Sequence, residues 1–243
     1  PYTASCTDLD VLFPDWAAGG GREAVLARLR DPNTRRRIRE DILQKRSEDY
    51  WESVRIGSTV HPGNRRFKGM PLVEVARALG REPVDAVLHL TDTDNLMTSA
   101  FFFTMSEANM WKILARPYVM FGSDASLRAT HGPLSHDHPH PRAYGSLTRF
   151  LRAALDGKTV SLAEAVHKST GLTAEHFRLK DRGVLAKGKW ADVVVLDPQN
   201  LREHTDFGDP HQLSTGVEQV IINGVHTLAN GRLTGQRAGR LLG

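Results

Sequence analysis

The spacing of apolar residues changes along the chain, and this change limits the fold more than any other sequence feature. In the first 120 residues apolar side chains recur every three or four positions, as in helices that bury one face. In the last sixty residues short β-branched runs are separated by Asn-Gly turns, as in antiparallel strands. A chain of 243 residues with both patterns predicts a mixed α/β fold with enough length for a substantial core.

Helix boundaries are marked by capping residues and by proline or glycine. Asp31-Pro32 predicts a helix start, Gly80 a helix end, and Ser161 with Glu164 a capping box. The predicted helices are residues 22–29, the stretch from Pro32 that contains Ile38, Ile42 and Leu43, residues 72–79, the stretch from Pro83, residues 105–114, residues 147–155 and the stretch after Ser161.

A short apolar run followed by a long polar loop is the main candidate for a functional region. Residues 118–121 (Tyr-Val-Met-Phe) predict a buried strand, and Asp124 follows it closely. Residues 123–146 are rich in Gly, Pro, Ser and His, and loops of this length inside a domain are usually functional. An aspartate after a strand is by itself more often a helix cap or turn residue. In a β/α barrel, however, catalytic side chains gather at the C-terminal ends of strands.

The C-terminal residues predict strands joined by tight turns. Asn223-Gly224, between the apolar runs 220–222 and 225–228, is the strongest short hairpin signal. Residues 183–197 predict a short strand, a turn at Gly188 and a buried strand over 192–196. By themselves these residues predict a hairpin without chemistry.

Composition excludes several classes of protein. The net charge is +4 and the pI about 9.4, but the basic run 35–39 is followed at once by Glu40 and Asp41, which favours an ion-paired face over nucleic-acid binding. No apolar stretch approaches the length of a membrane span, and no secretory signal is visible. Cys6 is the single cysteine, so an internal disulfide is excluded, and we expect a cytoplasmic protein.

Five ordered stretches carry a resemblance to a known family. They are residues 1–4 (Pro-Tyr-Thr-Ala), residues 122–124 (Gly-Ser-Asp), residues 138–145 (His-Pro-His-Pro-Arg-Ala-Tyr-Gly), residues 180–183 (Lys-Asp-Arg-Gly), and residues 183–197 together with Ile-Ile-Asn-Gly at 221–224. The last resembles the C-terminal signature of the amidohydrolase superfamily. The others are similar to the D-aminoacylases, the N-acyl-D-amino-acid deacylases, within that superfamily.

The resemblance implies a fold and its boundaries. It implies the α/β fold of the C-terminal part of a TIM-like (β/α) amidohydrolase barrel with a helical insertion, plus part of a small β-sandwich. Residues 1–181 would belong to the barrel, with the insertion at about 8–115, and residues 182–243 to the sandwich. Because the chain begins at Pro1 without a methionine, we expect a processed product or a fragment.

The resemblance also implies a reaction and its residues. It implies metal-dependent hydrolysis of N-acyl-D-amino acids to a D-amino acid and a carboxylate. Asp124 would be the catalytic carboxylate, and Arg142 would bind the substrate's α-carboxylate with its two-pronged guanidinium. Tyr2 and Cys6 would also contact substrate. Zinc is the implied metal, as one or two divalent ions, with Asp124 as a candidate ligand and the other ligands upstream of this chain.

Three alternating histidines also require an interpretation. On an extended strand His136, His138 and His140 would share a face like metal ligands. Pro139 and Pro141 favour polyproline geometry instead, which turns the three side chains apart. We therefore expect these histidines to orient Arg142 or its loop.

The implied partners are the N-terminal half of the same enzyme and a small-molecule N-acyl amino acid, with neither nucleic acid nor membrane. Two alternatives stay open from the residues. One is a cyclic-amide hydrolase of the hydantoinase or dihydroorotase type, which would not need a carboxylate-binding arginine. The other is a non-catalytic subunit, because the sequence lacks a His-x-His metal motif on a strand ahead of the Asp124 region.

Overall fold

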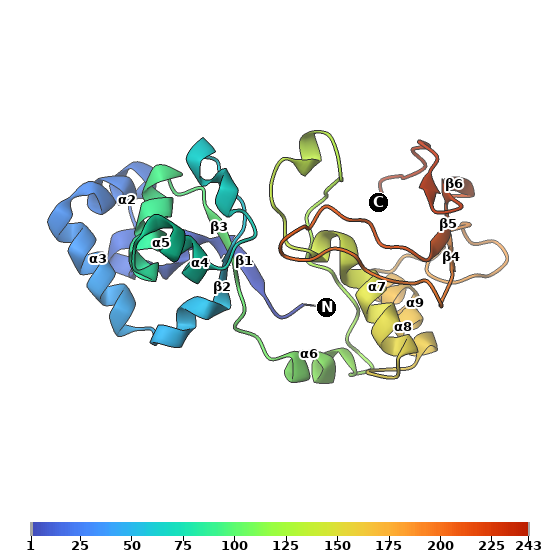
Figure 1. Ribbon diagram of the computed structural model, residues 1–243. Helices are drawn as coiled ribbons and strands as arrows, with labels where there is room; N and C mark the ends of the chain where they lie inside the picture. The colour runs from blue at the N-terminus through green and yellow to red at the C-terminus, as the bar shows by residue number, and fades with distance from the viewer. Residues whose placement is uncertain (1, 243) are drawn as a thin grey trace.

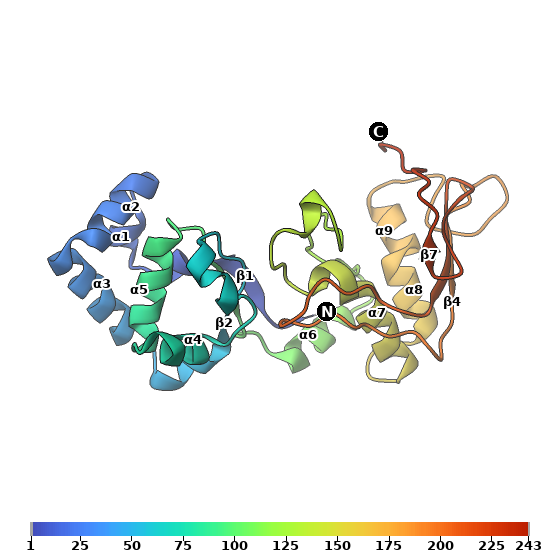
Figure 2. The same cartoon turned by 45° about the horizontal axis from the view of Figure 1, so that its top comes forward.

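Two lobes lie side by side along the molecule (Figures 1 and 2). A computed structural model describes residues 2–242, so Pro1 of the 1–4 motif lies outside the described residues. The N-terminal lobe runs from β1 to β3, residues 5–102, and the C-terminal lobe runs from α6 to β7, residues 107–233. The fold therefore mixes helices and sheet in both lobes, which confirms the α/β prediction.

The N-terminal lobe packs helices around one small antiparallel sheet. The strands are β1 (Ser5–Asp8), β2 (Val54–Ile56) and β3 (Ser99–Phe102), in the order β1-β3-β2. The helices are η1 (Leu9–Leu12), α1 (Asp15–Ala18), α2 (Gly21–Arg30), α3 (Pro32–Gln44), η2 (Glu48–Ser53), η3 (Pro62–Phe67), α4 (Leu72–Leu79) and α5 (Pro83–Thr93). One continuous core joins these elements, from Leu9 to Phe102.

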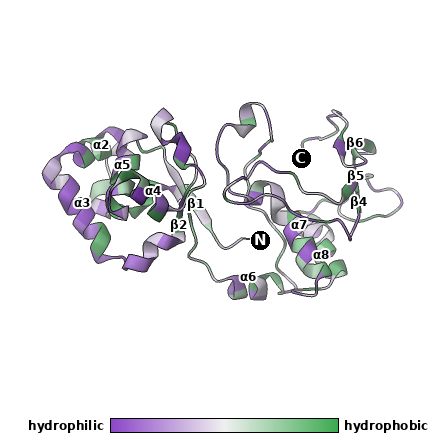
Figure 3. Cartoon of the chain, in the orientation of Figure 1, coloured by the Kyte–Doolittle hydropathy of each residue, from purple (hydrophilic) through white to green (hydrophobic). Residues whose placement is uncertain are grey.

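The capping signals predicted the helices of this lobe well. Asp31 accepts the Thr34 amide at 2.8 Å and so caps α3, as predicted. Gly80 ends α4 with φ 61°, in the left-handed region that glycine enters without strain. Figure 3 shows why α3 lies on the surface, because hydrophilic colour runs along most of it while α4 and α5 carry apolar residues. Arg39 of α3 pairs with Asp85 at 3.1 Å, in line with the expected ion-paired face.

The three strands of this lobe were not predicted. Each has only three or four residues, too few for a period of two to stand out among helical patterns. β3 is the central strand, so it pairs with both neighbours, and Phe101 and Phe102 of β3 are buried. The burial of β3 accounts for Phe101 and Phe102, whereas Phe103 follows the strand and is exposed.

The C-terminal lobe packs helices against a four-stranded antiparallel sheet. Its helices are α6 (Glu107–Leu114), η4 (Pro133–Ser135), α7 (Arg142–Leu155), α8 (Leu162–Ser169) and α9 (Gly171–His176). Its strands are β4 (Val193–Leu196), β5 (Val217–Ile222), β6 (Val225–Ala229) and β7 (Arg232–Leu233), in that order across the sheet. Phe150, Leu151, Ala154, Ala165 and Leu201 form its core.

The predicted hairpin is confirmed. Asn223 and Gly224 have φ 51° and 80°, as a two-residue type I′ turn requires, and Ile222 pairs with Val225. Asn230-Gly231 makes the next turn in the same way, with φ 50° and 71°.

The predicted strand over residues 118–121 is wrong. Its backbone is irregular, and Tyr118 is 76% exposed. A strand needs a neighbouring strand to accept and donate its backbone hydrogen bonds, and here α8 takes that place. The Lys168 side chain donates to the Val119 carbonyl at 2.9 Å, and the Phe121 amide donates to the Lys168 carbonyl at 3.1 Å. Residues 118–121 are therefore held by a helix and not by a sheet.

The prediction for residues 183–197 is also partly wrong. Residues 183–189 contain no strand, and Val184 and Leu185 are exposed. β4 is present but is not a buried strand, because Val193 and Leu196 are partly buried while Val194 and Val195 are exposed. The turn at Gly188 is correct, with φ 85°.

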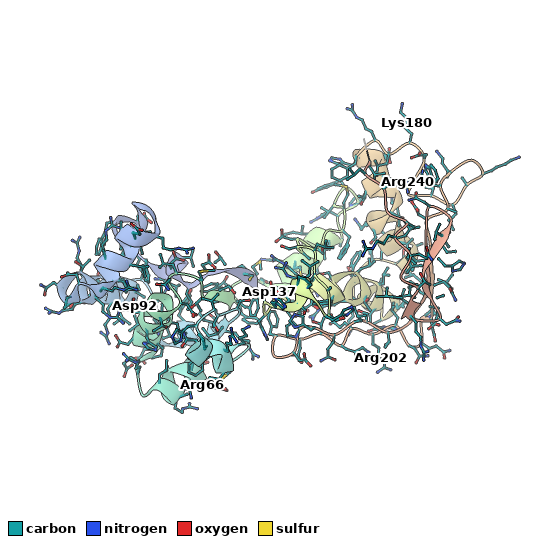
Figure 4. The ribbon with its side chains drawn as sticks, turned by 90° about the horizontal axis from the view of Figure 1, so that it is seen from above. Arg66, Asp92, Asp137, Lys180, Arg202 and Arg240 are labelled. Carbon is teal, nitrogen blue, oxygen red and sulfur yellow. The ribbon has the colours of Figure 1, made fainter. Side chains whose placement is uncertain are left out.

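The lobes meet at a small junction. His138 donates its amide to the Ser58 hydroxyl at 2.7 Å, and its ring nitrogen Nε2 contacts the Phe207 carbonyl at 2.9 Å. Figure 4 shows Asp137 beside this junction, between the two lobes. Asp137 forms an ion pair with Arg128 at 2.7 Å, which closes the base of the 125–137 loop.

All strand pairs within residues 2–242 are antiparallel. The described residues therefore do not display the parallel strands of the predicted TIM-like barrel. Within the same range, the helices are too short or too polar to cross a membrane.

Candidate active site

A cavity of about 480 Å³ lies where α6, the 121–124 segment and the start of α7 come together. Its wall is largely apolar on the α6 side and polar on the other. The lining residues are Tyr2, Ala4, Met105, Ser106, Asn109, Met110, Ile113, Leu114, Phe121, Gly122, Ser123, Asp124, Arg142 and Ser146. A cavity of this size suits a small molecule with one apolar and one charged part.

Two of the predicted site residues meet in this cavity. Nη1 of Arg142 lies 3.0 Å from Oδ2 of Asp124. The Asp124 side chain is 88% exposed, whereas that of Arg142 is 24% exposed. The carboxylate therefore projects into solvent at the cavity wall, and the guanidinium lies deeper beside it. Because a guanidinium carries five N–H donors, this contact leaves others free to bind a second anion.

Arg142 is held at the first residue of α7. Its backbone amide donates to Nδ1 of His140 at 3.0 Å, and Nε2 of His140 lies 3.0 Å from the Ala4 carbonyl. Burial, with a smaller contribution from the Arg142 charge, lowers the pKa of His140 to about 4. The ring is therefore neutral at neutral pH and can accept the amide.

Asp124 is held from the other side. It follows residues 116–121, whose carbonyls at Arg116 and Val119 accept from the fully buried Lys168. Phe121 stacks on Phe150 of the lobe core with ring centroids 4.9 Å apart. Asp124 itself has φ 53°, a left-handed backbone that aspartate adopts more readily than most residues.

Tyr2 lines the cavity, and its contact with substrate stays a prediction. Its hydroxyl donates to Oε2 of Glu203 at 2.7 Å, and Arg149 binds the other oxygen of Glu203 at 3.2 Å. Burial, together with the neighbouring Glu203 carboxylate, raises the pKa of Tyr2, so its phenol stays protonated. Glu203 and Arg149 were missed by sequence reasoning, because no local motif points to a glutamate 201 residues away from its partner.

Cys6 is not part of the cavity wall formed by residues 2–242. It lies on β1 opposite Phe101 and is partly buried, and burial raises the pKa of its thiol. Contact between Cys6 and substrate remains a prediction.

Two of the alternating histidines, His138 and His140, pack against the same Phe101 ring but bind different backbone carbonyls, those of Phe207 and Ala4. Residues 2–242 contain no group of three His, Cys, Asp or Glu side chains that could hold a metal ion. Because both ring nitrogens of His140 already have backbone partners, that ring has no free lone pair for a metal.

Comparison with known proteins places these residues in a family. Residues 119–227, from the segment before Asp124 to β6, match the amidohydrolase family. A D-aminoacylase from Alcaligenes xylosoxydans xylosoxydans is 38% identical over 178 residues, which is 72% of this chain and 34% of that protein. An N-acyl-D-glutamate deacylase from the same organism is 36% identical over 75% of this chain and 35% of its own length. This chain belongs to the D-aminoacylase family of amidohydrolases.

Solved D-aminoacylase structures agree with the fold. One crystal structure of a D-aminoacylase matches with a TM-score of 0.68 and 29% identity, over 99% of this chain and 41% of that one. An N-acyl-D-glutamate deacylase from Bordetella bronchiseptica matches with a TM-score of 0.66 and 28% identity, over 96% and 40%; it was solved with zinc and a phosphonate inhibitor. The chain thus spans about a third of the length of its curated D-aminoacylase relatives.

Proposed function

We propose that this chain forms part of a metal-dependent N-acyl-D-amino-acid deacylase and supplies its proton-transfer and carboxylate-binding groups. The observation that supports this most directly is the contact between Asp124 and Arg142 at the wall of one cavity. Membership in the D-aminoacylase family adds the substrate class. The reaction is hydrolysis of an N-acyl bond to a D-amino acid and a carboxylate.

Asp124 would carry the proton. As water attacks the acyl carbon, the carboxylate accepts a proton from it, and then gives this proton to the amine nitrogen as the carbon–nitrogen bond breaks. The exposed position of the side chain allows it to reach both groups. The ion pair with Arg142 fixes one of its oxygens and leaves the other for the water.

Arg142 would bind the α-carboxylate next to the scissile amide. Its remaining N–H donors match the two oxygens of a carboxylate. Because Tyr2 stays protonated and lies in the same wall, it would add a neutral contact to the substrate. The apolar side of the cavity, formed by α6, would then face the uncharged part of the substrate.

Residues 2–242 do not form a metal site by themselves. The proposed enzyme therefore takes its other metal ligands from sequence outside this chain, with zinc as the metal, as in the Bordetella bronchiseptica relative. When bound, such a metal polarises the substrate carbonyl. The missing sequence would also complete the TIM-like barrel and the β-sandwich, and would be the partner of this chain in the folded enzyme.

The sharpest test compares two arginines of one loop region in the complete enzyme. Arg142→Ala should lower kcat/KM on an N-acyl-D-amino acid roughly thirty- to several-thousand-fold, the effect of losing a guanidinium–carboxylate pair worth about 2–5 kcal/mol. The α-amide of the same substrate should be affected much less. Arg128→Ala is the matched control, because Arg128 also pairs with an aspartate, has similar burial and does not line the cavity.

Equal losses on the acid and on the amide would remove the carboxylate-binding role from Arg142. A preference for cyclic amides, with linear substrates left intact, would instead indicate the hydantoinase or dihydroorotase alternative. An enzyme that stays inactive when complete and zinc-loaded would indicate a non-catalytic subunit.

A further inference from the structure

We infer that His140 is a positioning residue that fixes the place of Arg142 in the cavity. This inference rests on the proposed function, because it takes Arg142 to be the carboxylate-binding group. Nδ1 of His140 accepts a hydrogen bond from the Arg142 backbone amide at 3.0 Å. The ring therefore holds the backbone of the residue that carries the guanidinium. The other nitrogen of the ring lies 3.0 Å from the Ala4 carbonyl.

The partners of the two ring nitrogens fix its protonation. A carbonyl can only accept, so Nε2 carries the hydrogen toward Ala4. A backbone amide can only donate, so Nδ1 presents its lone pair to Arg142. His140 is therefore a neutral ring with a defined tautomer, connecting the N-terminal segment to the first residue of α7.

The ring has little room to move. It is 4% exposed and contacts three aromatic side chains edge-on, with centroid distances of 5.2 Å to Tyr2, 5.5 Å to Phe101 and 4.9 Å to Phe207. Tyr2 itself lines the cavity, so one imidazole contacts two of the three predicted substrate-binding residues, Tyr2 and Arg142. A fixed His140 ring would therefore fix the Arg142 backbone from which the guanidinium extends.

His140 also anchors the first turn of α7 through its own carbonyl. That carbonyl accepts the Ala143 amide at 3.0 Å, while Pro141 has no amide to satisfy. The first amides of a helix have no partners within the helix, so these two bonds determine where α7 begins. Arg142 points toward Asp124 from this fixed start.

His138 provides an unusually close control. It is 8% exposed, contacts the same Phe101 ring and places Nε2 at 2.9 Å from a backbone carbonyl, that of Phe207. Its side chain does not bind the Arg142 amide, which is held by His140. If both buried histidines had only a structural role, the same substitution at position 138 or at position 140 should change KM by a similar factor.

The experiment uses amide side chains that reproduce one ring nitrogen at a time. His140→Asn keeps an acceptor near the place of Nδ1, whereas His140→Gln keeps a donor near the place of Nε2 and loses the acceptor. In the complete zinc-loaded enzyme, His140→Gln should raise KM for an N-acyl-D-amino acid roughly tenfold, the effect of one lost hydrogen bond, and change the α-amide analogue little. His140→Asn should retain the ratio of acid to amide within a few-fold, as should His138→Gln.

Equal effects of Asn and Gln at position 140, equal losses on acid and amide, or the same loss from His138→Gln would each overturn the inference. If Arg142→Ala is selective for the acid and His140→Gln is not, only the inference fails; if Arg142→Ala is itself not selective, the proposed function fails with it. NMR of isotope-labelled histidine in the unmodified enzyme gives a test that needs no variant to fold. A hydrogen on Nδ1 of His140 at neutral pH would contradict the assigned tautomer.

Discussion

Asp124 combines an exposed side chain with a left-handed backbone, φ 53°. Asn tolerates this conformation as Asp does, whereas most other side chains are strained there. Asparagine is therefore the substitution that removes the charge and leaves the backbone unchanged.

Asp124→Asn in the complete enzyme should fold normally and retain its metal, yet lose about two to four orders of magnitude in kcat, the usual effect of removing a general base. Steady-state kinetics together with metal analysis checks this. Asp137→Asn is the matched control, since Asp137 pairs with Arg128 away from the cavity, and it should retain kcat. Turnover near that of the unmodified enzyme in Asp124→Asn would show that another group carries the proton.

The sequence named candidate site residues, but it did not indicate how they are held in place. Asp124 and Arg142 follow from the family resemblance, but their contact depends on the path of the loop between them. That path is set by distant bonds, such as the Tyr144 hydroxyl to the Ala129 carbonyl at 2.8 Å. Glu203, the partner of Tyr2, could not be predicted, because its role depends on a fold that brings together two residues 201 positions apart.

At the scale of elements, local rules succeeded where caps and turns mark the boundaries. α3 begins at its predicted cap Asp31, and the hairpin turns at Asn223-Gly224. The local rules failed for the short apolar run 118–121, whose structure depends on residues that are distant in the sequence. Residues 118–121 lie against α8 through Lys168, a contact between residues about 50 positions apart that no local pattern contains.

Lys168 of α8 holds residues 116–121 through hydrogen bonds to two of their backbone carbonyls. Lys168→Met leaves the Arg116 and Val119 carbonyls and Glu164 without their buried cation, which should lower the free energy of unfolding by about 1–3 kcal/mol. Because Asp124 follows the released segment, kcat should also fall at temperatures where the variant is fully folded. Thermal unfolding and kinetics measured side by side check both effects.

Lys158→Met is the control for this variant, since Lys158 is exposed and pairs only at the surface, with Asp156 at 3.5 Å. Lys168→Arg, which keeps the charge, should recover part of the stability. Unchanged kcat in a destabilised Lys168→Met would show that the segment positions itself without the lysine.

At the scale of the whole molecule, the two lobes differ in how well they bury apolar surface. The N-terminal lobe has a large continuous core, whereas the C-terminal lobe has a small one and exposes apolar side chains. The exposed ones include Tyr118, Leu127, Phe177, Val194 and Leu233. Apolar side chains that are exposed in one part of a protein become buried when another part packs on them.

Residues 1–243 expressed alone should therefore show no deacylase activity and should aggregate or bind hydrophobic dyes. The complete enzyme, in which the proposed missing sequence covers these side chains, should not. Light scattering, dye fluorescence and limited proteolysis check this, with cleavage expected first in the C-terminal lobe. A monodisperse, active, zinc-loaded monomer of this chain would refute the prediction and the proposed partner together.

The two cores also follow one another along the chain without overlap, one from Leu9 to Phe102 and the other from Phe150 to Leu201. A growing polypeptide tends to fold domain by domain from its N-terminal side. The N-terminal lobe can therefore complete its core while the ribosome is still adding the residues of α7. The Arg142–Asp124 pair belongs to the C-terminal lobe and would form late, after the N-terminal lobe has folded. Errors of synthesis in the C-terminal lobe would therefore leave the N-terminal lobe intact and prevent the cavity from forming.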